Sequence, residues 1–297
     1  MRTEGDTWDI VSSVGMTALF VAAIRAVESK QPDALVHDEF AALFVAASGD
    51  PTTNQLIDNP QLWADSPLGT EFMGLRSKFF DNLFLAAAEA GVRQAVIVAA
   101  GLDARAYRLD WPQGMVVYEI DQPKVLEFKR QVLADAGAAP KADRREVAVD
   151  LRENWPAALI EEGFDPAVPT VWSAEGLLGY LPGAAQDALF ARIDQLSAPG
   201  SSLACDVFDT DLDYQQIADF QAEQLRDLPF GKIDFVDLVY TDDRSDPAEW
   251  LTNQGWTTTS ARPEELAERY DRPLTAALQP MAQMFNNMRY LSAAKPA

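Results

Sequence analysis

The 297-residue sequence has a single cysteine, Cys205, and a single histidine, His37. One cysteine excludes an internal disulfide and a cysteine-based metal site. One histidine, in a segment that connects two predicted helices, makes a histidine-based metal site and a Ser-His-Asp triad poor expectations. We therefore expect no bound metal and a reaction that does not depend on an imidazole.

Basic residues are also scarce: 24 Lys and Arg stand against 46 Asp and Glu, so the formal net charge is −22. A chain with this charge is repelled by phosphates, which argues against nucleic acid and anionic membranes as partners. No apolar run reaches the roughly 18 residues that a membrane-spanning helix needs, and the charged residues 1–6 lack the apolar core of a signal peptide. We expect a cytoplasmic protein, and the sequence does not indicate its oligomeric state.

Glycine is missing where a dinucleotide-binding loop would need it. The apolar run 95–100 ends at Gly101, but Ala99 and Asp103 occupy the positions around it. The motif G-x-G-x-x-G serves to bring backbone close to a pyrophosphate, so a carboxylate in its place disfavours an NAD-linked oxidoreductase. A nucleoside without phosphate and with a positive centre fits better. S-adenosylmethionine, which has a sulfonium and an ammonium group, is the expected cofactor.

Four hydrophobic strands are predicted in succession, and an acidic residue ends or closely follows each. A fifth strand and two further strands at one sheet edge are expected, with helices between the later strands. Parallel βαβ repetition is the simplest topology for this alternation. Ligands of open α/β sheets bind at the carboxyl ends of the strands, so we expect the acids to line one cleft. The expected strands are 95–100, 115–120, 145–149, 170–174 and 202–207, then two from 250–259 and 284–293; the helices are 122–136, 155–161 and 184–196.

Residues 1–92 contain no strand signal and are expected to form a helical cap. Asp38 is a plausible N-cap and Gly91 a plausible C-terminal stop for two of its helices. Residues 93–297 are expected to form the cofactor-binding α/β core, with an acidic lid insertion at about 208–232, all in one continuous domain. The helices expected in the cap are 17–28, 38–47 and 71–90.

Three acids lie at or just after the ends of the first two strands. Asp103 lies in the loop after the first strand, and we include it among the cofactor-binding residues. Glu119, 18 residues after Gly101, can accept hydrogen bonds from both ribose hydroxyls, and Asp121 is expected to project the same way. The alternative for Asp121 is that it caps the helix that follows.

Further candidates bind the two ends of the cofactor. Asp150 can accept a hydrogen bond from the adenine amine while Leu151 packs on the base. Arg76, on the long N-terminal helix, can bind the carboxylate of an amino-acid cofactor through its planar fork. The alternative is a surface arginine with Lys78 beside it.

Together, five segments resemble the leucine carboxyl methyltransferase family, and most of all its actinobacterial branch of S-adenosylmethionine-dependent methyltransferases. The resemblance covers nearly the whole chain and implies a class I methyltransferase, with a Rossmann-like α/β fold, a mostly parallel seven-stranded sheet and helical caps. The segments are 76–81, 98–108, 118–124, 150–151 and 174–182.

The same resemblance implies a role for each site residue. Arg76 would bind the methionine carboxylate, Gly101 would shape the cofactor loop, and Glu119 or Asp121 would hold the ribose. Asp150 and Leu151 would contact adenine, and Glu175 would lie near the methionine amino group.

We expect methyl transfer to an oxygen, with a carboxylate of a small molecule or a peptide terminus as the acceptor. The resemblance supports this, because eukaryotic members methylate a protein's C-terminal carboxylate and bacterial relatives include enzymes that form small-molecule methyl esters. A carboxylic acid is already ionised at neutral pH, so we expect no general base and name no catalytic residue. The alternatives are hydroxyl methylation of a polyketide-like or phenolic metabolite, and a non-catalytic cofactor-binding protein.

Overall fold

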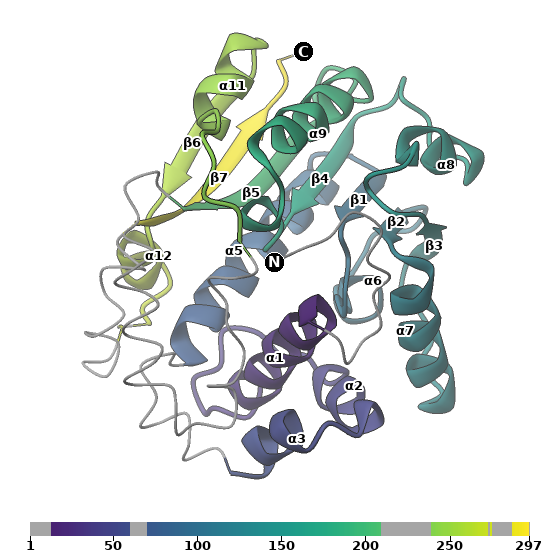
Figure 1. Cartoon of the computed structure of the whole chain (residues 1–297), viewed down its shortest axis with the longest axis vertical. Coiled ribbons are helices and arrows are strands. Elements are labelled where there is room, and N and C mark those ends of the chain that lie inside the picture. Colours follow the sequence, from purple (N-terminus) through teal and green to yellow (C-terminus); the bar gives the residue numbers. More distant parts are fainter. Residues whose placement is uncertain (1–12, 60–69, 209–238, 273, 275–286, 297) are drawn as a thin grey trace.

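The centre of the protein is a seven-stranded sheet with the order β3-β2-β1-β4-β5-β7-β6 (Figure 1). The computed structural model describes residues 13–59, 70–208, 239–272, 274 and 287–296. Neighbours among β1 to β5 pair in parallel, whereas β7 runs antiparallel to both β5 and β6. The expectation of a mostly parallel seven-stranded sheet is confirmed. The strands are β1 (Gln94–Val98), β2 (Val116–Asp121), β3 (Asp143–Ala148), β4 (Thr170–Ala174), β5 (Ser202–Phe208), β6 (Thr257–Ala261) and β7 (Met288–Ala294).

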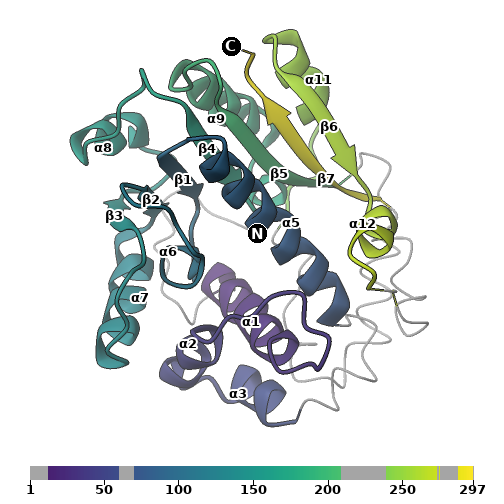
Figure 2. The same ribbon diagram turned by 180° about the vertical axis from the view of Figure 1, so that it is seen from behind.

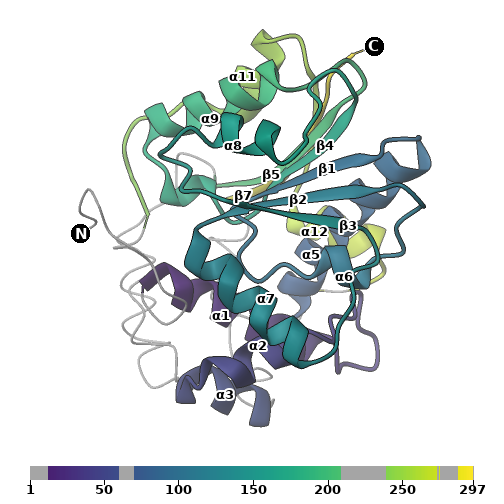
Figure 3. The ribbon, with the colours of Figure 1, turned by 90° about the vertical axis from the view of Figure 1, so that its right-hand side faces the viewer.

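Helices cover both faces of this sheet (Figures 2 and 3). Successive residues of a strand point to opposite faces, so Val96 and Val98 belong to one apolar core while Ala95 and Ile97 belong to the other. The face of Val96 is covered by α8 (Trp155–Glu161), α9 (Gly183–Gln195) and α11 (Pro247–Asn253). The opposite face is covered by α5 (Thr70–Glu89), α6 (Arg105–Arg108), α7 (Pro123–Asp135) and α12 (Pro263–Arg269).

Three helices near the N-terminus form a further group beyond the second layer: α1 (Ser13–Glu28), α2 (Ala41–Ser48) and α3 (Pro51–Asp58). They contact one another, and α1 also packs on α5 while α2 packs on α7. In turn, α5 contacts β4 and β5, so it connects this group to the sheet. No helix in the described part of the chain is long and apolar enough to cross a membrane.

The ends of several elements follow local chemistry. Gly91, at φ +97°, ends α5 as expected, and the N–H groups of Gly91 and Val92 donate to the last carbonyls of the helix. Asp38 is not an N-cap, because α2 begins later and its N-cap is Phe40. The Asp38 carboxylate still accepts from the N–H groups of Phe40 and Ala41.

The prediction of a strand within 250–259 is largely wrong. Residues 247–253 form α11, because Asp246 accepts from two N–H groups of its first turn and Pro247 occupies the first helical position. Only β6, from Thr257, fits the expectation. The expected lid lies outside the described residues except for Phe208, as do positions 284–286 of the last expected strand.

Candidate cofactor site

The carboxyl ends of β1, β2, β3 and β4 lie at one edge of the sheet, where contacts connect most of the predicted residues in two groups. In one group the N–H of Gly101 donates to Asp121 Oδ2 (2.6 Å), and Gln122 Nε2 donates to Asp150 Oδ2 (3.1 Å). In the other group a chain of ion pairs connects Asp103, Glu175 and Arg76 through Arg105. The structure therefore brings six of the eight predicted residues into two adjoining clusters, and places Glu119 and Leu151 elsewhere. The six are Arg76, Gly101, Asp103, Asp121, Asp150 and Glu175.

The loop after β1 departs from strand geometry at once. Ala99 has φ +53° and Gly101 has φ +49°, so the strand ends at Val98, two residues earlier than expected. A positive φ is uncommon for a residue with a side chain, and such backbone occurs where the surrounding structure holds it in place. The N–H of Ala100 donates to the Ile120 carbonyl, which keeps the loop beside β2. The loop thus presents its Gly101 N–H group to Asp121 at the end of that strand.

Glu119 and Asp121 lie on the same face of β2 but have different surroundings. Glu119 is fully buried; its Oε2 lies 2.8 Å from Lys129 Nζ and accepts from Arg144 Nε at 2.7 Å. Burial lowers the pKa of Lys129, and Glu119 acts against that shift. Asp121 instead accepts from the N–H groups of Gly101 and Gln122. Its pKa is raised by burial, against the effect of those two bonds.

Asp150 and Leu151 follow β3. Asp150 forms an ion pair with Arg152 (2.7 Å) in addition to its bond from Gln122. Leu151 is half-buried and packs against the core under α8 and α9. Gln122 is the N-cap residue of α7, so the end of β2 and the end of β3 are connected by one side chain.

Arg76 extends from α5 to the ends of β4 and β5. Its Nε lies 3.0 Å from Glu175 Oε1, and its Nη2 lies 3.3 Å from Asp206 Oδ2. Asp206 also accepts from the N–H of Gly176 at 2.6 Å. Burial raises the pKa of Asp206, and Arg76 opposes that shift. Arg76 is buried, so the alternative of a surface arginine is wrong.

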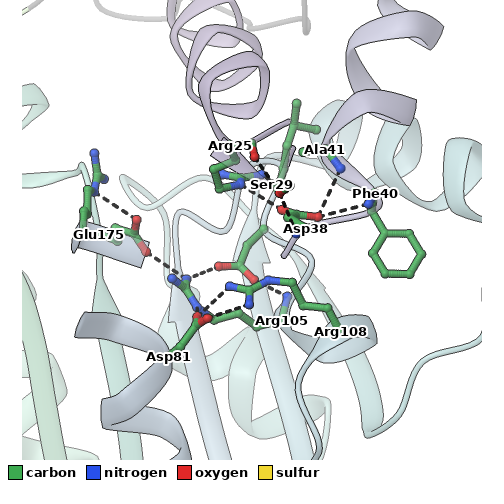
Figure 4. A network of polar contacts seen from close by, with 12 residues as sticks. Arg25, Ser29, Asp38, Phe40, Ala41, Asp81, Arg105, Arg108 and Glu175 are labelled. Atoms are coloured by element: carbon green, nitrogen blue, oxygen red, sulfur yellow. Dashed lines mark hydrogen bonds and ion pairs between the residues drawn. The ribbon is translucent and has the colours of Figure 1, made fainter. Parts of the chain in front are cut away.

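A second buried guanidinium, that of Arg105, shares Glu175 with Arg76. Figure 4 shows Arg105 with its carboxylate partners Asp81 and Glu175. Arg105 pairs with Asp103, with Glu175 (Nη1 to Oε2, 2.8 Å) and with Asp81 of α5 (Nε to Oδ1, 2.7 Å). Burial alone would raise the pKa of Asp103, but the charge of Arg105 outweighs it and lowers the pKa to about 2. Arg108 donates two bonds of 2.6 Å to Asp81.

Helix α1 closes over the loop after β1. Arg25 donates to the Leu102 carbonyl (2.7 Å) and to Asp38 (2.9 Å), and a Cβ added at Gly101 would lie 3.7 Å from the Ala18 side chain. The cap helices therefore contact the predicted cofactor loop directly. His37, by contrast, is exposed, with its Nδ1 3.3 Å from the Ser29 carbonyl.

The sequence reasoning did not name Asp206, Arg105 or Asp81 as part of this site. For Asp206 a signal was present, since it is an acid inside the apolar stretch 202–207, as in the four earlier strands. Arg105 lies two residues after Asp103 and carried no comparable signal. Asp81 lies on a helix far away in the sequence, and only the packing of α5 against the sheet brings it close.

A family model described as leucine carboxyl methyltransferase matches residues 18–194. The matched part contains the loop after β1 and the acids at the ends of β2, β3 and β4. The chain belongs to the leucine carboxyl methyltransferase family. The description of the family and the names of the relatives given next, which are S-adenosyl-L-methionine-dependent methyltransferases, confirm the expected enzyme class and cofactor.

Two relatives have similar sequences over nearly the whole length of this chain. A Rhodococcus jostii protein named "Putative S-adenosyl-L-methionine-dependent methyltransferase" is 55% identical, covering 99% of this chain and 100% of the relative. A Mycobacteroides abscessus protein with the same designation is 50% identical, covering 100% of this chain and 97% of the relative. A solved structure of a DUF574 family protein from Streptomyces avermitilis has a similar fold, with a TM-score of 0.50 at 15% identity, covering 86% of this chain and 96% of that one. The expected class I methyltransferase fold is confirmed.

Proposed function

We propose that this methyltransferase forms a methyl ester on a carboxylate of a small molecule or a peptide terminus, in the cytoplasm. The description of the family model, a carboxyl methyltransferase, supports an acceptor of this kind. When bound, S-adenosylmethionine supplies an electrophilic methyl group on a sulfonium. The residues at the strand ends bind and orient, and the acceptor brings its own negative charge.

The donor set at the strand ends fits that cofactor. We propose that Asp121, rather than the fully buried Glu119, holds the ribose, because Glu119 is already paired with Lys129 and Arg144. Asp150 and Leu151 would contact adenine at the end of β3. The loop at Gly101 would lie against the cofactor, because its positive φ and the absence of a side chain allow close approach.

The amino-acid end of the cofactor would be bound between α5 and β4. Glu175 offers carboxylate oxygens to an ammonium group, and Arg76 offers donors to a carboxylate. Asp103 is proposed to complete this end from the loop after β1. These assignments rest on the contacts that place the three side chains in one ion-pair chain.

One observation carries the choice of a carboxylate acceptor: the only histidine of the chain is exposed at the surface, where it contacts Ser29. An alcohol or phenol must lose a proton when it attacks, and histidine is the usual group for removing it at neutral pH. A carboxylate needs no such group. The lone thiol does not replace it, because Cys205 is buried and burial raises its pKa.

A second function, methylation of a hydroxyl group, is favoured by one observation. Asp206 is buried at the end of β5 with a raised pKa, as a carboxylate general base would be. Its contacts with Arg76 and the Gly176 N–H already use both carboxylate oxygens, which is why we place this function second.

The test is methyl transfer from methyl-labelled S-adenosylmethionine to a metabolite extract and to a mixture of short peptides. We expect a labelled product that mild base cleaves to methanol, as an ester does. The rate should be flat between pH 6 and 8, and His37→Ala should not change it. A base-stable ether with a rate that rises with pH would support hydroxyl methylation. Tight cofactor binding without turnover on either mixture would support a non-catalytic protein.

A further inference from the structure

Arg105 contacts three different parts of the protein at once. Its side chain is 3% exposed, and its guanidinium bonds to Asp81 on α5, Asp103 in the loop after β1 and Glu175 in the loop after β4. Figure 4 shows it between Asp81 and Glu175. The two loops belong to the proposed cofactor site, whereas α5 is a helix that packs on β4 and β5. Arg105 therefore bonds to that helix and to both loops at the same time.

Packing and backbone bonds fix the direction of this side chain. The guanidinium carbon lies 5.7 Å from the centre of the Phe80 ring and 5.8 Å from that of Phe84. The Arg105 N–H donates to Asp103 Oδ1 (2.6 Å), and its carbonyl accepts from Trp111 Nε1 (2.8 Å). Because Arg105 is held from both ends, it can in turn hold the carboxylates that it contacts.

We propose that Arg105 is a positioning residue that fixes the carboxylates of Asp103 and Glu175 for the amino-acid part of the cofactor. The proposal rests on the proposed placement of Glu175 at the methionine amino group. The two oxygens of Glu175 face Arg76 and Arg105, one each. A carboxylate oxygen has a second acceptor site, so Glu175 keeps two acceptors for an ammonium while two guanidinium groups hold its orientation.

Charge gives a second reason for this role. Arg105 lies among three carboxylates, those of Asp81, Asp103 and Glu175, which would repel one another without it. The guanidinium is planar and has several donors in a fixed fork, so it can serve all three at defined angles. The ammonium of a lysine is a point charge, and we expect it to keep the charge but not the orientation of both loop carboxylates.

Arg108 provides a matched control. It lies on the same short helix, its side chain is 7% exposed, and its guanidinium donates to Asp81. It thus shares the burial and one partner of Arg105, while its described bonds do not include either cofactor loop. A general loss of packing or charge around Asp81 would affect Arg105→Lys and Arg108→Lys alike.

The experiment compares two probes by calorimetry: S-adenosylhomocysteine, and 5′-methylthioadenosine, which lacks the amino-acid part. For Arg105→Lys we expect at least about tenfold weaker binding of S-adenosylhomocysteine, as loss of an oriented charge-assisted bond would cause, with 5′-methylthioadenosine within about twofold. Arg108→Lys should leave both affinities within about twofold. Glu175→Gln should show the selective loss, and its combination with Arg105→Lys should lose less than the sum of the two.

Other results would overturn either this inference or the proposed function. An unchanged affinity of Arg105→Lys for S-adenosylhomocysteine overturns the inference, and so does an equal loss for both probes, because Arg105 would then serve folding as a whole. If Arg105→Lys does not fold, Arg105→Gln takes its place under the same criteria, and failure of both to fold also overturns it. If Glu175→Gln binds both probes as the wild type does, the proposed placement of Glu175 is wrong, and the fault lies in the proposed function.

Discussion

Two acids two residues apart on β2 show how a side chain's surroundings decide its role. The sequence predicts ribose binding for Glu119 or Asp121, since both follow an apolar stretch at the right distance from Gly101. The structure gives Glu119 two buried cationic partners, whereas Asp121 is at the end of the strand and bonds to the loop after β1. Periodicity alone could not separate them, because residues two apart share a face of the strand.

We predict that Asp121→Ala and Glu119→Gln fail in different ways. Asp121→Ala should weaken S-adenosylhomocysteine binding by about 1–3 kcal/mol, the usual cost of losing one partner of a buried hydrogen bond. Glu119→Gln should lower the free energy of unfolding by about 3–5 kcal/mol, because it leaves Lys129 and Arg144 without their buried partner. Calorimetry and urea unfolding measure the two effects. If Asp121→Ala bound S-adenosylhomocysteine as tightly as the wild type, Asp121 would not hold the ribose, and Glu119 would be the remaining candidate.

Tyr290 leads to a prediction about stability. Its side chain is fully buried on β7, and its hydroxyl has no hydrogen-bond partner among the residues that the structure describes. A buried polar group without a partner costs free energy, so Tyr290→Phe should leave the free energy of unfolding unchanged or raise it by up to about 1 kcal/mol. Tyr118→Phe is the control, because its hydroxyl lies 3.4 Å from Arg145 Nη1, and a small loss is expected there. A loss of more than about 1 kcal/mol for Tyr290→Phe would show that the hydroxyl is paired in solution.

At the scale of elements, glycines that end a helix and a strand differ in what surrounds them. Gly91, after α5, has φ +97°, and no atom of the described residues lies within 4 Å of an added Cβ. Gly176, after β4 and Glu175, has φ +63°, and an added Cβ would lie 2.5 Å from Arg76 Nη2. The first glycine serves only backbone conformation, whereas the second also makes room for a side chain of the proposed site.

We therefore expect Gly91→Ala and Gly176→Ala to separate stability from binding. Each should lose about 1 kcal/mol of stability, since a left-handed conformation is unfavourable for alanine. Only Gly176→Ala should weaken binding of S-adenosylhomocysteine, because it displaces the Arg76 guanidinium from Glu175 and Asp206. Thermal unfolding and calorimetry on the same preparations test this. Equal affinities for the two variants would mean that the position of Arg76 does not matter for the ligand.

The elements that could be predicted from the sequence are those with a strong local signal. The helix 155–161 and the stop at Gly91 agree with the structure, because proline near a helix start and glycine after a helix end act locally. The block at 250–259 could not be assigned correctly, since an apolar stretch with a tryptophan fits a helix or a strand until the Asp246 cap is considered. The order of the strands could not be predicted either. β7 lies between β5 and β6 because of contacts between segments that are far apart in the sequence.

At the scale of the whole molecule, one part of the candidate site could be predicted from the sequence and another part could not. The acids at the strand ends could be predicted, because parallel strands place their carboxyl ends at one edge of a sheet. Their connection to α5 through Arg105 and Asp81 could not, because it joins residues 24 positions apart whose charges carry no periodic signal. The net charge of −22 shows the excess of acids but not which of them are paired.

Those pairings lead to a prediction about acid stability. The pKa of Asp103 is about 2 in the folded protein against an ordinary value of 3.8, because Arg105 outweighs the effect of burial. A carboxyl with a lowered pKa binds fewer protons when folded, so its contribution is complete above pH 4 and is lost as the pH falls toward 2. The shift corresponds to about 2 kcal/mol. Asp103→Asn should thus be less stable than the wild type by about this amount at pH 6, with a smaller difference at pH 3.

Asp110 is the control for this prediction. Lys141 lowers its pKa as well, but the Asp110 side chain is 94% exposed, so water and salt screen the pair. Urea unfolding of both variants with the wild type at pH 6, 4 and 3 gives the comparison. Asp110→Asn should follow the wild type at every pH, while the curve of Asp103→Asn approaches it only as the medium becomes acidic. A gap for Asp103→Asn that stays constant from pH 6 to 3 would mean that the Asp103 charge does not stabilise the fold, and that Arg105 is held in place by Asp81 and Glu175 alone.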